Sequence, residues 1–448
     1  MYHISLKLLT DACPGVFRWC LDYPRHEQRF DTKSLMGSGL MFQGWVLGEE
    51  RTNLRPFVKL AEKKIYLGLD FSRPDVVRKV LDKAPEGHSQ LRCGFRTTIP
   101  IATDNGVFGF ENAGIEYDLI HFSVEGSLKI LEGRDGWLFL DNDTNQSVEQ
   151  FCGKLLLDRL GQQAWLDYLD SLQELAKKCC CAYAVLIAPA KEMVMSDYYP
   201  YPKGLVTPIE QVEKLARPDH KVVNPAERMR VSKERMFRVC DTHWTHRGAL
   251  CGLMAILETL GLDVAGIEKL FEKDKFKKCL QAGDLGNKIF PKRAAQEWVL
   301  SGISYRKWVQ YDNHLPNIGR VIITQKKDAL ISAKCLIFGS SSSYTMLDYI
   351  ARVFSDLVFV HSAGNIDISL VTLEKPDFLI AQTNSRFVIR PPVVGYQLAD
   401  VIMEKWSELG ETDHAEVAGN QAHWVKSGIP ESGAYYHSLF ANKILLNS

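Results

Sequence analysis

The chain has 448 residues, of which 46% are hydrophobic and 24% are charged. Its 54 basic and 54 acidic side chains balance, so the net charge gives no reason to expect a nucleic-acid ligand. No window of about 18 uncharged apolar residues is present, which argues against a membrane-spanning helix. A chain of this length is long for one core, so we expect two domains and a tail.

The first residues and the cysteines predict where the protein works. The segment MYHISLKLLTDACPG has an apolar stretch too short and too interrupted for a secretory signal. The cysteines number eleven, and Cys179, Cys180 and Cys181 are consecutive, which no regular disulfide framework would use. We therefore expect a cytoplasmic chain with reduced thiols. No Cys or His cluster has zinc-site spacing, so we expect no metal.

The first part of the chain predicts a small β domain. Residues 1–34 form no clear element and are interpreted as an N-terminal lead-in. Residues 35–125 change to short apolar runs between turn residues, which is typical of a small antiparallel β-sandwich. Pro74 predicts a short helix that starts at that residue. The predicted strands cover residues 42–47, 57–60, 64–69, 94–101 and 107–110.

This β-sandwich resembles the accessory sandwiches attached to some bacterial polysaccharide-building enzymes. The residues that carry the resemblance are Gly44-Trp45-Val46, Arg73-Pro74-Asp75-Val76 and Gly94-Phe95. Trp45 and Phe95 could stack on a sugar, but we favour core packing, because aromatic side chains in a small domain mostly pack.

Residues 126–410 alternate between strand and helix patterns, which predicts a mostly parallel sheet with helices on both faces. Residues 411–448 are interpreted as a polar tail with a closing helix near 435–446. The predicted strands of the larger domain are 182–187, 221–223, 237–240, 335–338, 357–360 and 378–381. Its main predicted helices are 147–178, 247–260, 266–278, 344–354 and 397–409.

Four consecutive serines, Ser340 to Ser343, follow the strand that ends at Gly339, and an amphipathic segment follows them. Such a turn lifts a hydroxyl above the carboxyl edge of a sheet. It also points helix N-terminal N–H groups at that position, which suits an oxyanion or a phosphate. We choose Ser341, two places after Gly339, as the nucleophile, with its own N–H as an oxyanion donor. The alternative is a helix cap or an anion cradle.

The best candidate for the base lies upstream, in Asp241-Thr242-His243. Asp241 and His243 share a face of an extended segment, so the carboxylate can reach the imidazole Nδ1–H and leave Nε2 to take the proton of a serine. Asp241, His243 and Ser341 all follow predicted strands, and a parallel sheet would carry them to one edge. The alternative for the Asp-His pair is an ordinary structural hydrogen bond.

The larger domain contains six short motifs in this order: Gly133-Arg134-Asp135-Gly136-Trp137-Leu138-Phe139, Pro189-x-Lys191, Asp241-Thr242-His243-Trp244-Thr245, Gly283-Asp284-Leu285, Gly339-Ser340-Ser341-Ser342-Ser343 and Lys375-Pro376-Asp377. Taken together, these motifs resemble the alginate O-acetyltransferase group of the SGNH/GDSL hydrolase superfamily. The resemblance covers roughly residues 130–405 and implies an SGNH-hydrolase-like α/β fold, with Asp241, His243 and Ser341 as the triad.

The chain departs from this group in two ways. Many relatives have Gly-Asp-Ser where this chain has Gly339-Ser340-Ser341, although Gly-Thr-Ser also occurs. The alginate enzymes are exported, whereas this chain shows no export signal. The first departure keeps the nucleophile, and the second leaves the acyl donor and the glycan carrier open.

The resemblance implies serine-dependent acyl transfer, with an O-acetyltransferase that modifies hydroxyls of a bacterial surface polysaccharide or its precursor as the leading hypothesis. Such a transferase needs an acetyl donor, for which acetyl-CoA is a candidate, and no bound cofactor is expected. Gly339, Ser340, Lys191 and Arg386 are candidates for oxyanion or substrate binding, although for Arg386 we favour a structural role. Two alternatives remain: a carbohydrate acetylesterase and a non-catalytic glycan-binding protein.

Overall fold

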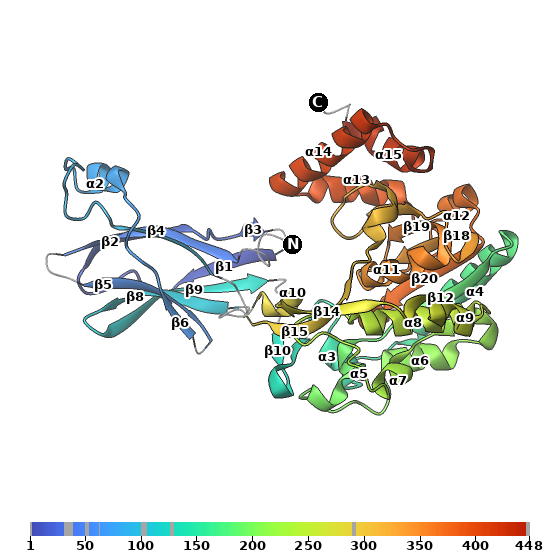
Figure 1. The fold of residues 1–448 in the computed structure, drawn as a ribbon. Helices are drawn as coiled ribbons and strands as arrows, with labels where there is room; N and C mark the ends of the chain where they lie inside the picture. Colours follow the sequence, from blue (N-terminus) through green and yellow to red (C-terminus); the bar gives the residue numbers. More distant parts are fainter. Residues whose placement is uncertain are drawn as a thin grey trace. The chain divides into compact units, whose positions relative to one another are not determined.

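The computed structural model describes residues 2–30, 39–49, 53–61, 63–99, 105–125, 130–288 and 293–444. The chain forms two compact units (Figure 1). The first comprises Met1–Glu132, Leu140–Thr144 and Ala282–Ala294, and the second comprises Gly133–Phe139, Asn145–Gln281 and Ala295–Ser448.

The first unit has two antiparallel sheets, as the sequence pattern predicts. One sheet has the strand order β3-β1-β9-β8-β5-β6 and the other has the order β2-β4-β7. Aromatic side chains of both sheets share one core, where Phe42 packs on Phe122 and Phe95 packs on Phe108. The elements of this unit are β1 (Tyr2–Leu8), β2 (Val16–Tyr23), β3 (Gln28–Phe30), β4 (Leu40–Gly48), β5 (Leu54–Leu60), β6 (Lys63–Tyr66), α2 (Pro74–Val80), β7 (Gly94–Ile99), β8 (Asn105–Asn112), β9 (Ile115–Glu125) and α10 (Gly283–Gly286).

The interpretation of the N-terminus as a lead-in is wrong for residues 2–30, because β1 pairs with β9 and β2 pairs with β4. Ile4 is fully buried in the sandwich core and Leu6 packs against that core, an alternation that the sequence contains. Trp45 and Phe95 are both buried, which supports packing over sugar stacking. The predicted positions 31–34 and 100–101 lie outside the described residues.

The second unit is built on one mixed sheet with the strand order β13-β12-β20-β18-β19-β17-β16. The pairings from β13 to β19 are parallel, and β17 and β16 add an antiparallel edge, so the prediction of a mostly parallel sheet is confirmed. The strands are β12 (Ala182–Ala188), β13 (Val222–Val223), β16 (Val309–Asp312), β17 (Val321–Gln325), β18 (Ile331–Gly339), β19 (Phe354–His361) and β20 (Phe378–Asn384). β14 (Lys275–Gln281) and β15 (Ala295–Ser301) form a separate antiparallel hairpin.

Helices cover this sheet because its strands present apolar side chains on both faces. Leu336 and Phe338 of β18 share a core with Trp165, Leu370 and Ile402, which lie on three different helices. α8 and α11 contact one another as well as β12 and β19 respectively. The helices are α3 (Ser147–Phe151), α4 (Arg159–Lys178), α5 (Lys191–Val194), α6 (Pro208–Leu215), α7 (Ala226–Arg230), α8 (His246–Thr259), α9 (Val264–Phe271), α11 (Ser343–Val353), α12 (Ile368–Glu374), α13 (Leu398–Glu408), α14 (Glu411–Ser427) and α15 (Glu431–Ile444).

Short elements fill the connections of the chain. β10 (Ile130–Glu132) and β11 (Leu138–Leu140) lie along the stretch where the chain passes from the first unit to the second. The remaining single turns are 3₁₀ helices: η1 (Arg134–Gly136), η2 (Ser196–Tyr198), η3 (Pro218–His220), η4 (Tyr305–Trp308) and η5 (Ser385–Phe387).

Three predicted elements of the second unit differ from the structure. The helix predicted over 147–178 is two helices, because Gly153 adopts a positive φ at which a Cβ would meet the Val206 carbonyl. The helix predicted over 266–278 ends at Phe271, and β14 follows it. Residues 237–240 form only an isolated bridge from Phe237 to Trp244 and are no strand of the sheet.

The C-terminal segment is part of the second unit and no polar tail. Tyr436 and Phe440 of α15 lie in the same core cluster as the central strands, and the Tyr436 hydroxyl donates to Glu374 Oε1 at 2.8 Å. The closing helix itself is confirmed as α15, although residues 445 and 446 lie outside the described range. No helix among the described residues is long and apolar enough to cross a membrane.

Candidate active site

The serine turn, residues Gly339 to Ser343, connects β18 to α11. A side chain at Gly339 would collide with Ser343 and Phe359, so the turn requires glycine there. Gln382 of the neighbouring strand β20 braces the turn: its Oε1 accepts from the Ser340 N–H at 2.7 Å and from the Ser343 hydroxyl at 2.8 Å. Asn384 Oδ1 accepts from the Ser342 hydroxyl at 2.9 Å. Side chains of one adjacent strand therefore fix this turn.

Ser341 differs from the other three serines of the turn. The hydroxyls of Ser340, Ser342 and Ser343 all bond to Gln382 or Asn384. Within the part of the chain that the structure describes, neither the hydroxyl nor the N–H of Ser341 has a hydrogen-bond partner. The side chain is half-buried. Helix α11 begins at Ser343 with Ser342 as its N-cap, so Ser341 lies just before the helix, in agreement with the helix predicted over 344–354.

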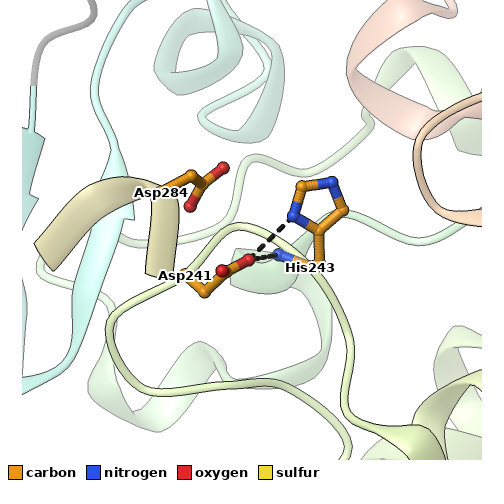
Figure 2. A group of neighbouring side chains, drawn as sticks. All are labelled: Asp241, His243 and Asp284. Carbon is orange, nitrogen blue, oxygen red and sulfur yellow. Dashed lines mark hydrogen bonds and ion pairs between the residues drawn. The ribbon is translucent and has the colours of Figure 1, made fainter. Parts of the chain in front are cut away.

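The Asp241 carboxylate and the His243 imidazole are hydrogen-bonded (Figure 2). Oδ1 of Asp241 lies 2.7 Å from His243 Nδ1 and accepts from the His243 backbone N–H at 2.8 Å. This is the contact that the spacing of the two residues predicts. Asp284, the third residue labelled in Figure 2, comes from the short helix α10 of the first unit.

The environment of Asp241 keeps its carboxyl group ionised. Burial by itself would raise the pKa of Asp241, since only 6% of the residue is exposed to solvent. The hydrogen bonds from His243 and the charges of His243 and Arg238 outweigh burial, so the pKa lies well below its usual value. An ionised carboxylate on Nδ1 holds the imidazole in the tautomer whose Nε2 can accept a proton.

The segment from Met236 to Thr245, called the His243 loop below, is held through its backbone by Lys191. The buried Lys191 ammonium donates to the carbonyls of Leu138, Val239 and Asp241 at 2.6, 2.8 and 3.0 Å. The same ammonium lies 5.0 Å from the centroid of the Trp137 ring. These three bonds match the three N–H donors of lysine. Lys191 therefore holds the loop through its backbone, and its role in substrate binding stays a prediction.

A second buried side chain, Glu297 of β15, holds the same loop. Its Oε1 accepts from the Val239 N–H at 2.9 Å, and its other oxygen pairs with Arg235. Burial raises the pKa of Glu297, while the Val239 N–H and the Arg235 charge oppose that rise. Val239 therefore gives its N–H to the Glu297 carboxylate, and its carbonyl accepts from the Lys191 ammonium and from the Leu138 N–H.

The His243 loop and the serine turn are tied together by Trp244. The buried Trp244 indole donates to the carbonyl of Ser342 at 2.9 Å. Trp244 follows His243 and Ser342 follows Ser341, so this bond joins the residues next to the candidate base and nucleophile. The His243 loop and the serine turn, which the sequence predicts to share one site, are therefore in direct contact.

His361 is a buried residue beside the serine turn. It ends β19 directly opposite Gly339, and its Nδ1 lies 3.0 Å from the Tyr344 hydroxyl of α11. Burial, the Arg320 guanidinium and the charge of His243 together lower the pKa of His361 to about 3, so the ring is neutral. Arg320 is itself fixed by two hydrogen bonds to Asp312.

Ser340, Gly339 and Arg386, the other residues considered from the sequence, make the following contacts within the second unit. The N–H and hydroxyl of Ser340 face Gln382 in the interior, which removes them as oxyanion donors. The Gly339 carbonyl accepts from Ser362 and Ala363, and the absent side chain of Gly339 lets Ser343 pack closely. Arg386 accepts a bond from Gln150 through its carbonyl and places its guanidinium 4.8 Å from the Phe387 ring centroid.

Sequence reasoning missed the residues that support the site. Gln382 and Asn384 could have been found, because they are polar residues that end a strand beginning with the apolar Phe378 to Ala381. Glu297 and His361 carry no comparable pattern, since each is one of several polar residues in a short strand.

The fold and site define an α/β protein with a mostly parallel sheet and an Asp-His pair tied to a serine turn at its edge. No model of a known protein family matches the chain, and no curated protein matches it. Several solved structures resemble it at low identity, and three are described here. PatB1 of Bacillus cereus has a TM-score of 0.42 and 13% identity, over 58% of this chain and 97% of PatB1.

The O-acetyltransferase domain of Pseudomonas putida AlgJ has a TM-score of 0.38 and 16% identity, over 63% of this chain and all 100% of that domain. AlgX of Pseudomonas aeruginosa has a TM-score of 0.32 and 15% identity, over 58% of this chain and 67% of AlgX. Identities and TM-scores this low assign neither a family nor an activity to this chain.

Proposed function

We propose that this protein is a serine-dependent acyltransferase with Ser341 as nucleophile, His243 as general base and Asp241 as the group that orients the base. One observation supports the proposal most directly. The Trp244 indole of the His243 loop donates a hydrogen bond to the Ser342 carbonyl of the serine turn. The loop contains the Asp241–His243 hydrogen bond, and the turn contains Ser341. A structural Asp-His bond or a helix cap alone would need no such tie.

In the proposed mechanism, His243 Nε2 takes the proton of the Ser341 hydroxyl as the oxygen attacks the carbonyl of an acetyl donor. The Ser341 N–H, which has no hydrogen-bond partner among the described residues, is placed to stabilise the oxyanion. The proton passes from His243 to the leaving group, and an acetyl-serine remains. His243 then deprotonates an acceptor hydroxyl, which attacks the ester and releases Ser341.

The acceptor decides the reaction class. We propose a hydroxyl of a bacterial surface polysaccharide or its precursor, which would make the protein an O-acetyltransferase; the resemblance of its sequence motifs to the alginate group is what suggests a glycan. Water as acceptor would give an acetylesterase through the same intermediate, and transfer requires the acceptor to displace water from the site. Acetate release with and without an oligosaccharide acceptor, at a fixed concentration of acetyl donor, separates the two.

The nucleophile can be tested by intact-mass measurement after treatment with a serine-reactive phosphonate. We expect one adduct on the wild-type chain and none on Ser341→Ala. Ser342→Ala is the matched control, because its hydroxyl bonds to Asn384, and it should keep the adduct. An adduct on Ser341→Ala would place the nucleophile elsewhere, and the absence of an adduct on all three proteins would refute serine catalysis.

A further inference from the structure

An open pocket of about 640 Å³ lies beside the hairpin β14–β15 in the second unit. Its wall includes Thr245, the last residue of the His243 loop and the N-cap of α8. Pockets of about 300 to 1,000 Å³ are the size that holds small ligands. The lining groups used below are Arg235, Arg247, Phe276, Lys278, Gln296 and Trp298, and we call this site the Trp298 pocket.

Trp298 gives the pocket a flat stacking surface. The residue is 52% exposed, although it is among the largest apolar side chains. It lies directly opposite Lys278 in the hairpin, and the Lys278 ammonium is 5.1 Å from the centroid of the indole ring. An exposed indole with a neighbouring cation can stack on a ring and bind a charged substituent of that ring at the same time.

The cations of the pocket are not equivalent. Arg247 lies 3.3 Å from the Glu234 carboxylate and stacks on Phe276, with 4.2 Å between its guanidinium carbon and the ring centroid. Arg235 pairs with the buried Glu297. Among the described residues, Lys278 is the one cation of this pocket without a carboxylate partner. Lys278 therefore has positive charge available for an anionic ligand.

We propose that the Trp298 pocket binds a ring that carries an anionic group, with the ring stacked on Trp298, the anion at Lys278 and a polar edge of the ring at the Gln296 amide. Two sources share this chemistry: the uronic acid of a glycan acceptor, and the nucleoside phosphate part of an activated acyl donor. The identity of the ligand rests on the proposed acyltransferase function, since Thr245 places the pocket two residues from His243. Binding itself requires no catalysis.

Calorimetric titration of the Ser341→Ala protein tests the pocket without turnover. The probes are ADP, methyl glucuronide and the neutral methyl glucoside. We expect at least one anionic probe to bind more tightly than the glucoside. Lys278→Gln should weaken that binding by about tenfold or more, because a charge-assisted hydrogen bond is lost. Trp298→Ala should weaken it by a similar factor through loss of stacking.

Lys277→Gln is the matched control, because Lys277 precedes Lys278 on the same strand and does not line the pocket. Its affinities should equal those of the parent protein. Binding of ADP alone identifies a nucleotide donor, and binding of the glucuronide alone identifies an acidic glycan. The proposal is overturned if neither anion binds better than the glucoside, or if Lys278→Gln and Trp298→Ala bind like the parent. Either result leaves the phosphonate adduct on Ser341 untouched, so failure of the pocket and failure of the catalytic proposal are distinguishable.

Discussion

The serine turn and the His243 loop carry the two halves of the candidate site, and they are held in opposite ways. The serine turn joins a regular strand to a regular helix, and Gln382 and Asn384 of the adjacent strand bond its side chains and its Ser340 N–H. The His243 loop has no regular partner, and buried charged side chains, Lys191 and Glu297, bond its backbone. The candidate nucleophile is thus held by neighbouring secondary structure, whereas the candidate base depends on contacts between distant parts of the sequence.

The largest effect on activity is expected from Asp241→Asn, which changes the hydrogen bond between Asp241 and His243 inside the His243 loop. The amide cannot hold the same imidazole tautomer, so kcat/KM for an activated acetyl ester should fall about 10³- to 10⁴-fold while the fold is kept. Asp356→Asn is the control, since that carboxylate bonds Gln325 at the other end of the sheet, and its activity should be within threefold of wild type. An Asp241→Asn protein within tenfold of wild type would show that the pair is only structural.

A second test compares Lys191, which bonds the His243 loop, with Gln382, which bonds the serine turn. Lys191→Met removes the ammonium that bonds three carbonyls, of which that of Val239 keeps the Leu138 N–H as a donor, so the free energy of unfolding should fall by about 3 kcal/mol or more, and activity should fall with it. Gln382→Leu removes neutral hydrogen bonds of the serine turn and should cost about 1 to 3 kcal/mol. Urea unfolding and kcat/KM are measured for both variants. Lys177→Met, at an exposed position of α4, should change neither quantity. A larger loss for Gln382→Leu than for Lys191→Met would reverse the comparison.

A third test concerns the pH dependence of stability at His361, which lies opposite Gly339 of the serine turn. Its folded pKa is lowered to about 3, against about 6.5 in the unfolded chain, so the unfolded chain takes up the proton first. The stability that neutral His361 contributes is complete above about pH 6.5 and is lost as the pH falls towards 3, with a slope of up to about 1.4 kcal/mol per pH unit.

Urea unfolding of wild type and His361→Gln at several values between pH 7 and pH 4 measures this contribution. We expect the difference in the free energy of unfolding between the two proteins to shrink as the pH falls. A difference that stays constant over this range would mean that His361 is not held neutral.

The sequence predicted the parts of the site whose structure is local. The apolar run before Gly339 and the helical spacing after Tyr344 define a strand, a turn and a helix without reference to the rest of the chain. The contact between Asp241 and His243 follows from their separation by one residue. The roles of Lys191 and Glu297 could not be predicted, because a lysine that bonds three carbonyls is set by tertiary distances and leaves no pattern in the sequence.

The errors in the fold have similar causes. β1 was missed because its alternation is short, with Ile4 buried in the core and Leu6 packed against it. α14 and α15 were interpreted as a tail because their surfaces are largely polar, although Val417, Tyr436 and Phe440 are buried in the core. The break at Gly153 was missed because a single glycine inside a helical pattern is tolerated unless a close approach, here from the Val206 carbonyl, forbids a side chain.

The strand order of the large sheet has a consequence for how the protein is made. β12 pairs along its length with β20, although β18 and β19 lie between them in the sequence, and β18 is enclosed by two strands that are both translated after it. A growing polypeptide on the ribosome thus holds β12 with an unsatisfied edge until nearly all of the sheet has been synthesised. Such a nascent chain is open to wrong pairings for most of translation, and its yield should depend on how well chaperones shield that edge.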